Sequence, residues 1–140
     1  MHKDAIVFLS YAHKDESIVT DIYHVLKKAR YLPWIDKFDI KPGEDWERAI
    51  KIAIKKSFVF LAVISANSYA RRGVLQKEIL MALDNWESLL PDDVYIIPVR
   101  IDNSPLPERL ARFQAVDWFS PNGINMLMIA IEYALSRTKN

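Results

Sequence analysis

Short apolar runs alternate along the chain with segments in which apolar residues recur at helical spacing. The runs predict five strands, at residues 6–9, 32–35, 58–64, 94–101 and 116–119. The helical spacing predicts helices over residues 18–29, 46–54, 75–86 and 124–135, with a helical turn at 106–110. Strands that alternate with helices form parallel sheets through right-handed crossovers. We therefore expect residues 1–140 to form one α/β domain, with a flavodoxin-like five-stranded parallel sheet (order 2-1-3-4-5) and helices on both faces.

Three local signals refine this pattern. Asp15 or Ser17 is the expected N-cap of the first helix. Pro98 interrupts the fourth strand, which predicts either a bulge or a position on an edge side of that strand. The segment 36–44 is polar and contains Pro42-Gly43, so we expect a loop there.

Two hydroxyl side chains follow the first strand at the point where open α/β folds bind their ligands. The run at residues 6–9 stops at Ser10-Tyr11. In the predicted strand order, the switch point lies between strands 1 and 3, and ligands bind there beyond the carboxyl ends of the strands. We expect a crevice bounded by Ser10-Tyr11, the loop after Asp36, and residues 65–69.

Composition narrows the class of protein. Apolar residues make up 51% and charged residues 26% of the chain, which is typical of a globular domain. The net charge of +1 gives no electrostatic case for nucleic acid or an anionic membrane as a partner. The chain has no cysteine, which excludes disulfides and thiolate chemistry, and its longest apolar run is too short to cross a bilayer. We expect a cytoplasmic domain without a signal peptide, either alone or as a module of a longer protein.

Several kinds of site that occur on such folds do not match this sequence. A phosphorylated receiver domain needs an acid pair after the first strand, where this chain has Ser10-Tyr11. Dinucleotide and P-loop sites need clustered glycines, and the three glycines here are scattered. His13 and His24 have no partner at metal-ligand spacing, so we expect no metal site.

Glu78 is an acid in an unusual position, one residue before Ile79 of the apolar stripe on the third predicted helix. A carboxylate at such a boundary can be partly desolvated and aimed into a cleft. The alternative is a surface glutamate that the helix dipole favours, paired with Lys77 or Arg71.

The segment 36–46 also allows two interpretations. It combines two lysines and several acids with Phe38 and the Pro42-Gly43 turn, and loops on a rigid sheet often carry binding function. The alternative is a plain strand-to-helix connection, in which Glu44 and Asp45 favour the first turn of the next helix.

The order and spacing of these segments resemble a TIR domain of the bacterial type. Residues 5–11 (AIVFLSY) resemble the opening box of that family, and residues 36–46 resemble its long loop after the second strand. Residues 63–68 and 72–79 are similar to its third strand and catalytic helix. Residues 97–99 and 117–119 match the fourth strand and the last box. The resemblance extends over nearly the whole chain.

The resemblance implies that Glu78 is the catalytic glutamate of an NAD-cleaving TIR domain. It implies an NAD+ pocket lined by Ser10, Tyr11, Asp36 and Gly43, to which we add Trp46, or alternatively Tyr69, as the source of an aromatic ring beside the nicotinamide. It also implies a self-association loop made of Phe38, Asp39, Ile40 and Pro42, with Phe38 and Ile40 as apolar anchors on a neighbouring domain.

In that chemistry NAD+ is a substrate, and no cofactor or metal is required. Nicotinamide leaves as a neutral ring, so a single carboxylate can stabilise the positive charge on the ribose. Ordinary glycosidases need two carboxylates because their leaving group is poor. The implied function is an NAD+ glycohydrolase, or a cyclase, that self-association activates in bacterial immune signalling such as antiphage defence.

Two departures from the family pattern keep a second function open. Many active members carry an aromatic residue one turn before the glutamate, where this chain has Val74. Several carry a basic residue after the Ser-Tyr pair, where this chain has Ala12. Both departures favour a non-catalytic TIR adaptor that only assembles with other TIR domains, whereas Glu78 in register favours the enzyme.

Overall fold

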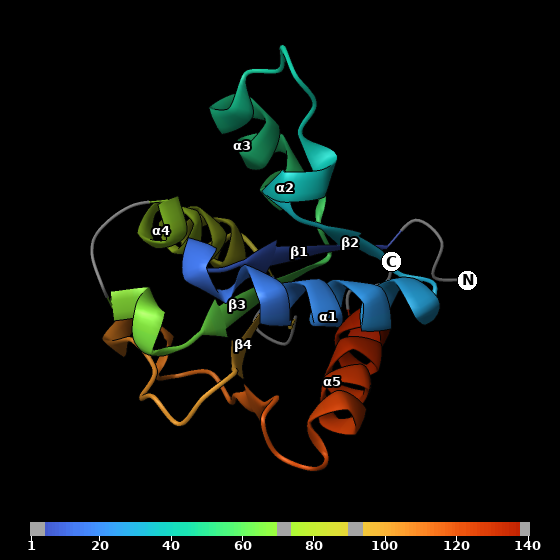
Figure 1. Cartoon of the computed structure of the whole chain (residues 1–140), viewed down its shortest axis with the longest axis vertical. Coiled ribbons are helices and arrows are strands. Elements are labelled where there is room, and N and C mark those ends of the chain that lie inside the picture. The colour runs from blue at the N-terminus through green and yellow to red at the C-terminus, as the bar shows by residue number, and fades with distance from the viewer. Residues whose placement is uncertain (1–4, 70–73, 90–93, 138–140) are drawn as a thin grey trace.

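A computed structural model describes residues 5–69, 74–89 and 94–137 of the chain. Within them, five parallel strands form one sheet in the order β2-β1-β3-β4-β5 (Figure 1). The strands are β1 (Ile6–Ser10), β2 (Leu32–Trp34), β3 (Val59–Ile64), β4 (Ile96–Arg100) and β5 (Val116–Asp117). The helices are α1 (Glu16–Lys28), α2 (Asp36–Asp39), α3 (Trp46–Lys56), α4 (Val74–Glu87) and α5 (Gly123–Arg137). Short 3₁₀ turns occur at η1 (His13–Asp15), η2 (Ala66–Tyr69) and η3 (Glu108–Leu110). The predicted fold class and strand order are confirmed.

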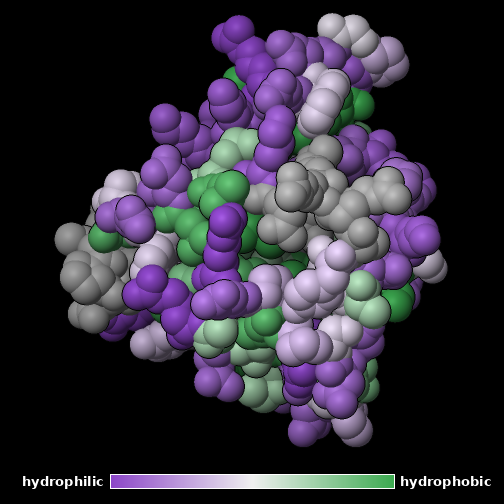
Figure 2. All heavy atoms as spheres, turned by 90° about the vertical axis from the view of Figure 1, so that its left-hand side faces the viewer, coloured by the Kyte–Doolittle hydropathy of each residue, from purple (hydrophilic) through white to green (hydrophobic). Residues whose placement is uncertain are grey.

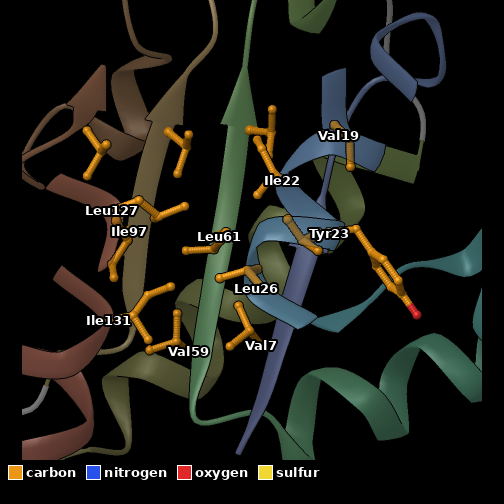
Figure 3. Close-up of a cluster of buried hydrophobic side chains, with 14 of the residues drawn as sticks. Val7, Val19, Ile22, Tyr23, Leu26, Val59, Leu61, Ile97, Leu127 and Ile131 are labelled. Atoms are coloured by element: carbon orange, nitrogen blue, oxygen red, sulfur yellow. The ribbon is translucent and has the colours of Figure 1, made fainter. Parts of the chain in front are cut away.

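Alternate residues of the central strands belong to two apolar layers, one on each face of the sheet. Val7, Leu61 and Ile97 point to the layer that α1 and α5 cover, where Leu26 and Leu127 contact them (Figure 3). Phe8, Phe60 and their neighbours point to the opposite layer, which α3 and α4 cover. All six residues of β3 are buried, because both faces of this central strand are covered. Full burial of each large side chain contributes about 1.5–3 kcal/mol.

Pro98 lies inside β4 without a bulge. The ladder between β3 and β4 runs unbroken through the pair Ala62 and Pro98. Ile101 N–H donates to β3, whereas the Arg100 carbonyl accepts from Trp118 beyond β5, so even-numbered residues of β4 face β5. The Pro98 nitrogen therefore faces that side, ahead of the first β5 pair, Val99 with Val116. The edge-side interpretation is confirmed and the bulge is wrong.

The segment expected to be a loop begins with a helical turn, α2, which corrects the prediction for residues 36–44. Asp39 Oδ2 accepts a hydrogen bond from Ile35 N–H at 2.9 Å, which closes this turn from its carboxyl end. Lys37 forms an ion pair with Glu16, and this contact fastens α2 to α1. Four residues are too few to display helical periodicity, so the pattern could not reveal this element.

Asp15 occupies the N-cap position of α1 but does not cap the helix with its side chain. The helix begins directly after the 3₁₀ turn η1. The Asp15 carboxylate instead points to residues that follow β3, where it accepts two hydrogen bonds. The expected position is confirmed, and the expected capping role is wrong because a tertiary contact replaces it.

Gly123, the first residue of α5, lies against the backbone of Trp118. A Cβ atom at this position would sit 2.3 Å from the Trp118 carbonyl oxygen, which the chain cannot move without disturbing β5. We expect Gly123→Ala to lower the free energy of unfolding by about 3 kcal/mol. Urea denaturation measures this. A loss below about 0.5 kcal/mol, the size of an ordinary surface substitution, would contradict the prediction.

Candidate functional site

Ser10 and Glu78 meet at the carboxyl end of the sheet, although 68 positions separate them in sequence. Ser10 is the last residue of β1, and Glu78 lies early in α4, directly before Ile79 of the buried helix face. The Ser10 Oγ donates to Glu78 Oε1 at 2.6 Å. Ser10 is fully buried, and only 6% of Glu78 is exposed. The structure therefore joins two of the predicted site residues inside the protein.

Burial dominates the electrostatics of Glu78. It raises the pKa of the carboxyl group to about 8, against the opposing effect of the Ser10 hydrogen bond and with a smaller raising effect from Asp36. Lys77, the expected surface partner, pairs with Glu47 at 3.7 Å, and Arg71 lies outside the described residues. The interpretation of Glu78 as a surface glutamate is wrong, because an exposed side chain would not be desolvated in this way.

Tyr11 and Asp36 form a second contact beside the first. The Tyr11 hydroxyl donates to Asp36 Oδ1 at 3.0 Å, which joins the end of β1 to the start of α2. Burial, followed by the charge of Asp36, holds the pKa of Tyr11 above its ordinary value, so this side chain stays a neutral donor. Asp36 also acts on the pKa of Glu78, so the two contacts belong to one electrostatic environment.

The remaining residues of the predicted pocket lie on the projecting segment that contains α2 and the start of α3 (Figure 1). Gly43 adopts a positive φ of 94° in an exposed turn. Trp46 begins α3, and half of its surface is exposed. A Cβ atom at Gly43 would have no neighbour within 4 Å. Hydrogen bonds therefore join Ser10 to Glu78 and Tyr11 to Asp36, whereas Gly43 and Trp46 are exposed.

The predicted self-association residues divide into two groups. Phe38 is 42% exposed and its ring contacts Tyr23 of α1 edge-on, with centroids 4.9 Å apart. Pro42 is exposed as well. Ile40 packs partly against the apolar layer under α3, and Asp39 is partly buried by its bond to Ile35. Phe38 is therefore the more accessible of the two expected apolar anchors.

Sequence reasoning missed a buried polar cluster beside this site. Asp15, Ser65 and Ser68 are buried at the carboxyl ends of β1 and β3. Asp15 Oδ2 accepts from Ser65 Oγ at 2.5 Å, and Asp15 Oδ1 accepts from Asn67 Nδ2 at 2.7 Å. The sequence feature that could have indicated this cluster is Ser65, a polar residue directly after the fully apolar strand β3. Over the described residues, no group of three or more acids and histidines is arranged to hold a metal ion.

Comparison with known families decides what kind of domain carries this site. A family model described as TIR domain matches residues 7–128. The chain belongs to the TIR domain family. No curated protein matches the chain. No helix in the described part of this TIR domain is long and apolar enough to span a bilayer.

Solved structures agree with this assignment at the level of the fold. The TIR domain of the Toll-related receptor TRR-2 from Hydra magnipapillata superposes with a TM-score of 0.74 at 21% identity, over 90% of this chain and 97% of that chain. The TIR domains of the activated Roq1 resistosome, which directly recognises the pathogen effector XopQ, give a TM-score of 0.63 at 20% identity. That match extends over 94% of this chain and 73% of the other. At such identities the likeness establishes the shared fold.

Proposed function

We propose that this TIR domain cleaves the nicotinamide–ribose bond of NAD+, as a glycohydrolase or a cyclase. The observation that carries the proposal is the buried Glu78 carboxyl group at the carboxyl edge of the sheet, held by Ser10. A buried acid with a strongly raised pKa is typical of functional sites. In an open α/β fold, the switch point between β1 and β3 is where a ligand binds.

The chemistry needs one ionised carboxylate. The C1–N bond breaks and its electron pair leaves on the nicotinamide nitrogen, which turns the cationic ring into a neutral product. Positive charge then develops on the ribose, and a carboxylate fixed beside C1 stabilises it. In a hydrolase, water attacks C1 and releases a proton to solvent; in a cyclase, a nucleophilic group of the same molecule attacks C1 instead and loses its proton in the same way. The Ser10 hydroxyl donates to Glu78 and so favours its ionised form.

The surroundings of Glu78 suit a cationic ring. Asp36 adds a second negative charge near Glu78, and Tyr11 holds that carboxylate in place. Bound NAD+ brings its positively charged nicotinamide ring towards both acids. An opposite charge nearby lowers the pKa of a carboxyl group, so substrate binding promotes the ionisation that catalysis needs.

Self-association is the proposed activator. Exposed apolar side chains lie on several helices of this TIR domain, among them Phe38, Trp46, Leu80 and Ile129. Figure 2 shows apolar surface gathered near the middle of the face that carries α4, within a polar surround. Such patches are typical of protein interaction sites. We place the assembled enzyme in bacterial immune signalling in the cytoplasm, including defence against phages.

A non-catalytic adaptor is the second candidate. The observation in its favour is Ala12, which packs partly against the apolar layer under α3 and α4 and offers no charge to a phosphate. Val74 is the other departure from the active pattern, and its side chain lies outside the described residues. An adaptor has no need of a desolvated acid, so the burial of Glu78 weighs against this candidate.

The test is nicotinamide release from NAD+, measured with the domain dilute and then clustered on a multivalent scaffold. We expect release in the clustered sample and little in the dilute one. Light scattering confirms assembly in the same samples. A fully assembled sample that releases no nicotinamide would establish the adaptor.

The pH dependence of the reaction follows from the raised pKa of Glu78. The ionised carboxylate is the active form, so kcat/KM should rise with pH through about 8 and then level off. The kcat profile should rise at a lower pH, because bound NAD+ favours the ionised acid. Initial rates between pH 5 and 10 measure both profiles. A profile that is flat between pH 6 and 9 would contradict the assignment of Glu78 as the titrating group.

A further inference from the structure

Asp15 has no role in the reaction proposed above, yet it is one of the few buried acids of the described chain. Only 6% of its surface is exposed, and both carboxylate oxygens are engaged by side chains from the turn after β3. The two donors, Ser65 Oγ and Asn67 Nδ2, belong to residues 50 and 52 positions after Asp15 in the sequence. Asp15, Ser65 and Asn67 are called here the Asp15 clasp.

The Asp15 clasp is rigid on the side of the turn after β3. Asn67 N–H donates to Ser65 Oγ at 3.0 Å, so the serine hydroxyl is oriented while it donates to Asp15. Ser65 N–H in turn donates to Ser68 Oγ at 2.9 Å. On the other side, Asp15 N–H donates to the Ala12 carbonyl at 2.8 Å and closes the turn after β1. The clasp therefore joins two turns that are each closed by their own hydrogen bonds.

These two turns border the two halves of the candidate site. Ser10 and Tyr11 directly precede the turn that Asp15 closes. The turn that carries Ser65 and Asn67 leads along the chain towards α4, which bears Glu78. Among the described residues, the charge of Asp36 raises the pKa of Glu78, and the charge of Glu78 in turn raises the pKa of the neighbouring Tyr11. Because Ser10 lies two residues before the turn that Asp15 closes, we expect a shift of this turn to displace the Ser10 hydroxyl from Glu78 and to admit water beside it.

We propose that Asp15 is a positioning residue, which fixes the turn after β1 against the turn after β3 and thereby holds Ser10 on Glu78. The expected effect of Asp15 on the reaction rate rests on the proposed NAD+ cleavage, whereas its expected effect on the titration of Glu78 does not. Displacement of a catalytic group by about 1 Å can cost roughly 100-fold in rate. Water that enters beside Glu78 reduces its desolvation, so its pKa falls towards the ordinary value of a glutamate.

Exchanging the side chains of Asp15 and Asn67 tests the hydrogen bond between them. Asp15→Asn leaves one acceptor oxygen for two donors, and Asn67→Asp places two carboxylates across a contact of 2.7 Å. The combination Asp15→Asn with Asn67→Asp restores one amide and one carboxylate at unchanged net charge. We expect kcat for nicotinamide release to fall roughly 10- to 100-fold in each single variant, with a smaller change in KM, and to recover at least several-fold in the exchange.

The second measurement does not depend on nicotinamide release. Carbon-13 NMR of the Glu78 carboxyl group follows its titration, and we expect a lower pKa than the wild-type value in Ser65→Ala, which weakens the clasp without a change of charge. Ser65→Ala and Ser57→Ala are the matched pair. Both variants remove a buried, hydrogen-bonded hydroxyl. Ser57, whose hydroxyl donates to the Ile54 carbonyl, lies between α3 and β3, at the amino end of the strand and therefore away from Glu78. Only Ser65→Ala should move the Glu78 titration.

The outcomes separate the two proposals. Folded single variants with wild-type kcat and wild-type Glu78 titration would overturn the role of Asp15, as would a folded exchange variant without recovery. A wild-type protein that is assembled and releases no nicotinamide overturns the proposed function alone. The positioning role then stands if the Glu78 titration moves in Ser65→Ala and not in Ser57→Ala, and falls if it moves in both or in neither. If Asp15→Asn does not fold, the comparison of Ser65→Ala with Ser57→Ala still tests the positioning role of Asp15.

Discussion

The Glu78→Gln variant should fold and assemble like the wild type while its nicotinamide release falls by roughly 100- to 1,000-fold. Glutamine keeps the shape of the side chain and an oxygen that accepts the Ser10 hydrogen bond, so the site stays in place. It removes the negative charge that stabilises the ribose cation, and the loss of one preorganised electrostatic group costs about this much in kcat. Clustered protein and a nicotinamide assay by chromatography give the comparison.

The control for this prediction is Glu47→Gln. Glu47 is an exposed glutamate that pairs with Lys77 on the neighbouring α4, so its loss changes the net charge by the same amount outside the site. Its rate should match the wild type. Release by Glu78→Gln at the wild-type rate would show that another group carries the charge in the transition state.

The same variant should change the stability of the protein with a defined sign. The folded-state pKa of Glu78 is about 8, against 4.5 in its ordinary state, so the folded protein holds this proton more tightly than the unfolded chain. The wild type therefore loses stability as pH rises from about 4.5 through about 8, whereas Glu78→Gln does not. Above pH 8 the variant should be more stable by up to about 5 kcal/mol. Denaturation at pH 5 and pH 9 measures this difference.

The Phe38→Asp variant should remain folded and monomeric and lose the activation that clustering of the wild type produces. Phe38 is 42% exposed on the segment that projects beyond the sheet, so a charge there is solvated in the monomer and desolvated in a contact. The edge-on packing against Tyr23 is lost, which costs about 1 kcal/mol. A charge buried without a partner in an interface costs far more than this. Analytical ultracentrifugation and the nicotinamide assay follow assembly and activity together.

Leu32→Asp supplies the matched control. Leu32 is 41% exposed at the start of β2, so an apolar side chain is again replaced by a carboxylate at nearly the same exposure. We expect it to assemble and to be activated. Full activity in a strictly monomeric Phe38→Asp protein would refute activation by self-association through this loop.

The fold was predictable because its signals are local and repeated. The unbroken apolar run of β3 marks a strand that is covered on both faces, and the alternation of strands and helices fixes the parallel topology. The helix α2 was missed because four residues carry no periodicity. Its turn depends on the single contact between Asp39 and Ile35, which a pattern of apolar positions does not contain.

The site was predictable only in part, because its contacts join distant positions. The spacing placed Glu78 at the margin of a buried face, but its depth depends on Ser10 and on the elements that surround both residues. Asp15 matched a local N-cap signal, and the partners that override it lie about fifty positions away. Gly43 was assigned through resemblance alone and Trp46 as a substitute for a missing aromatic ring, and both are exposed in the structure.

The prolines of the sheet restrict how copies of this domain can associate. Strand β2, at one edge, has three residues, and Leu32 N–H points inward to Ala5, so the Pro33 nitrogen faces outward. At the other edge β5 has two residues, and Pro98 removes a donor from the stretch of β4 that β5 leaves uncovered. Neither border offers the regular row of amide donors that cross-β aggregation uses as a template. In the proposed assembly we therefore expect copies to meet through side chains on helices and loops, a mode of contact that would allow the assembly to dissociate again.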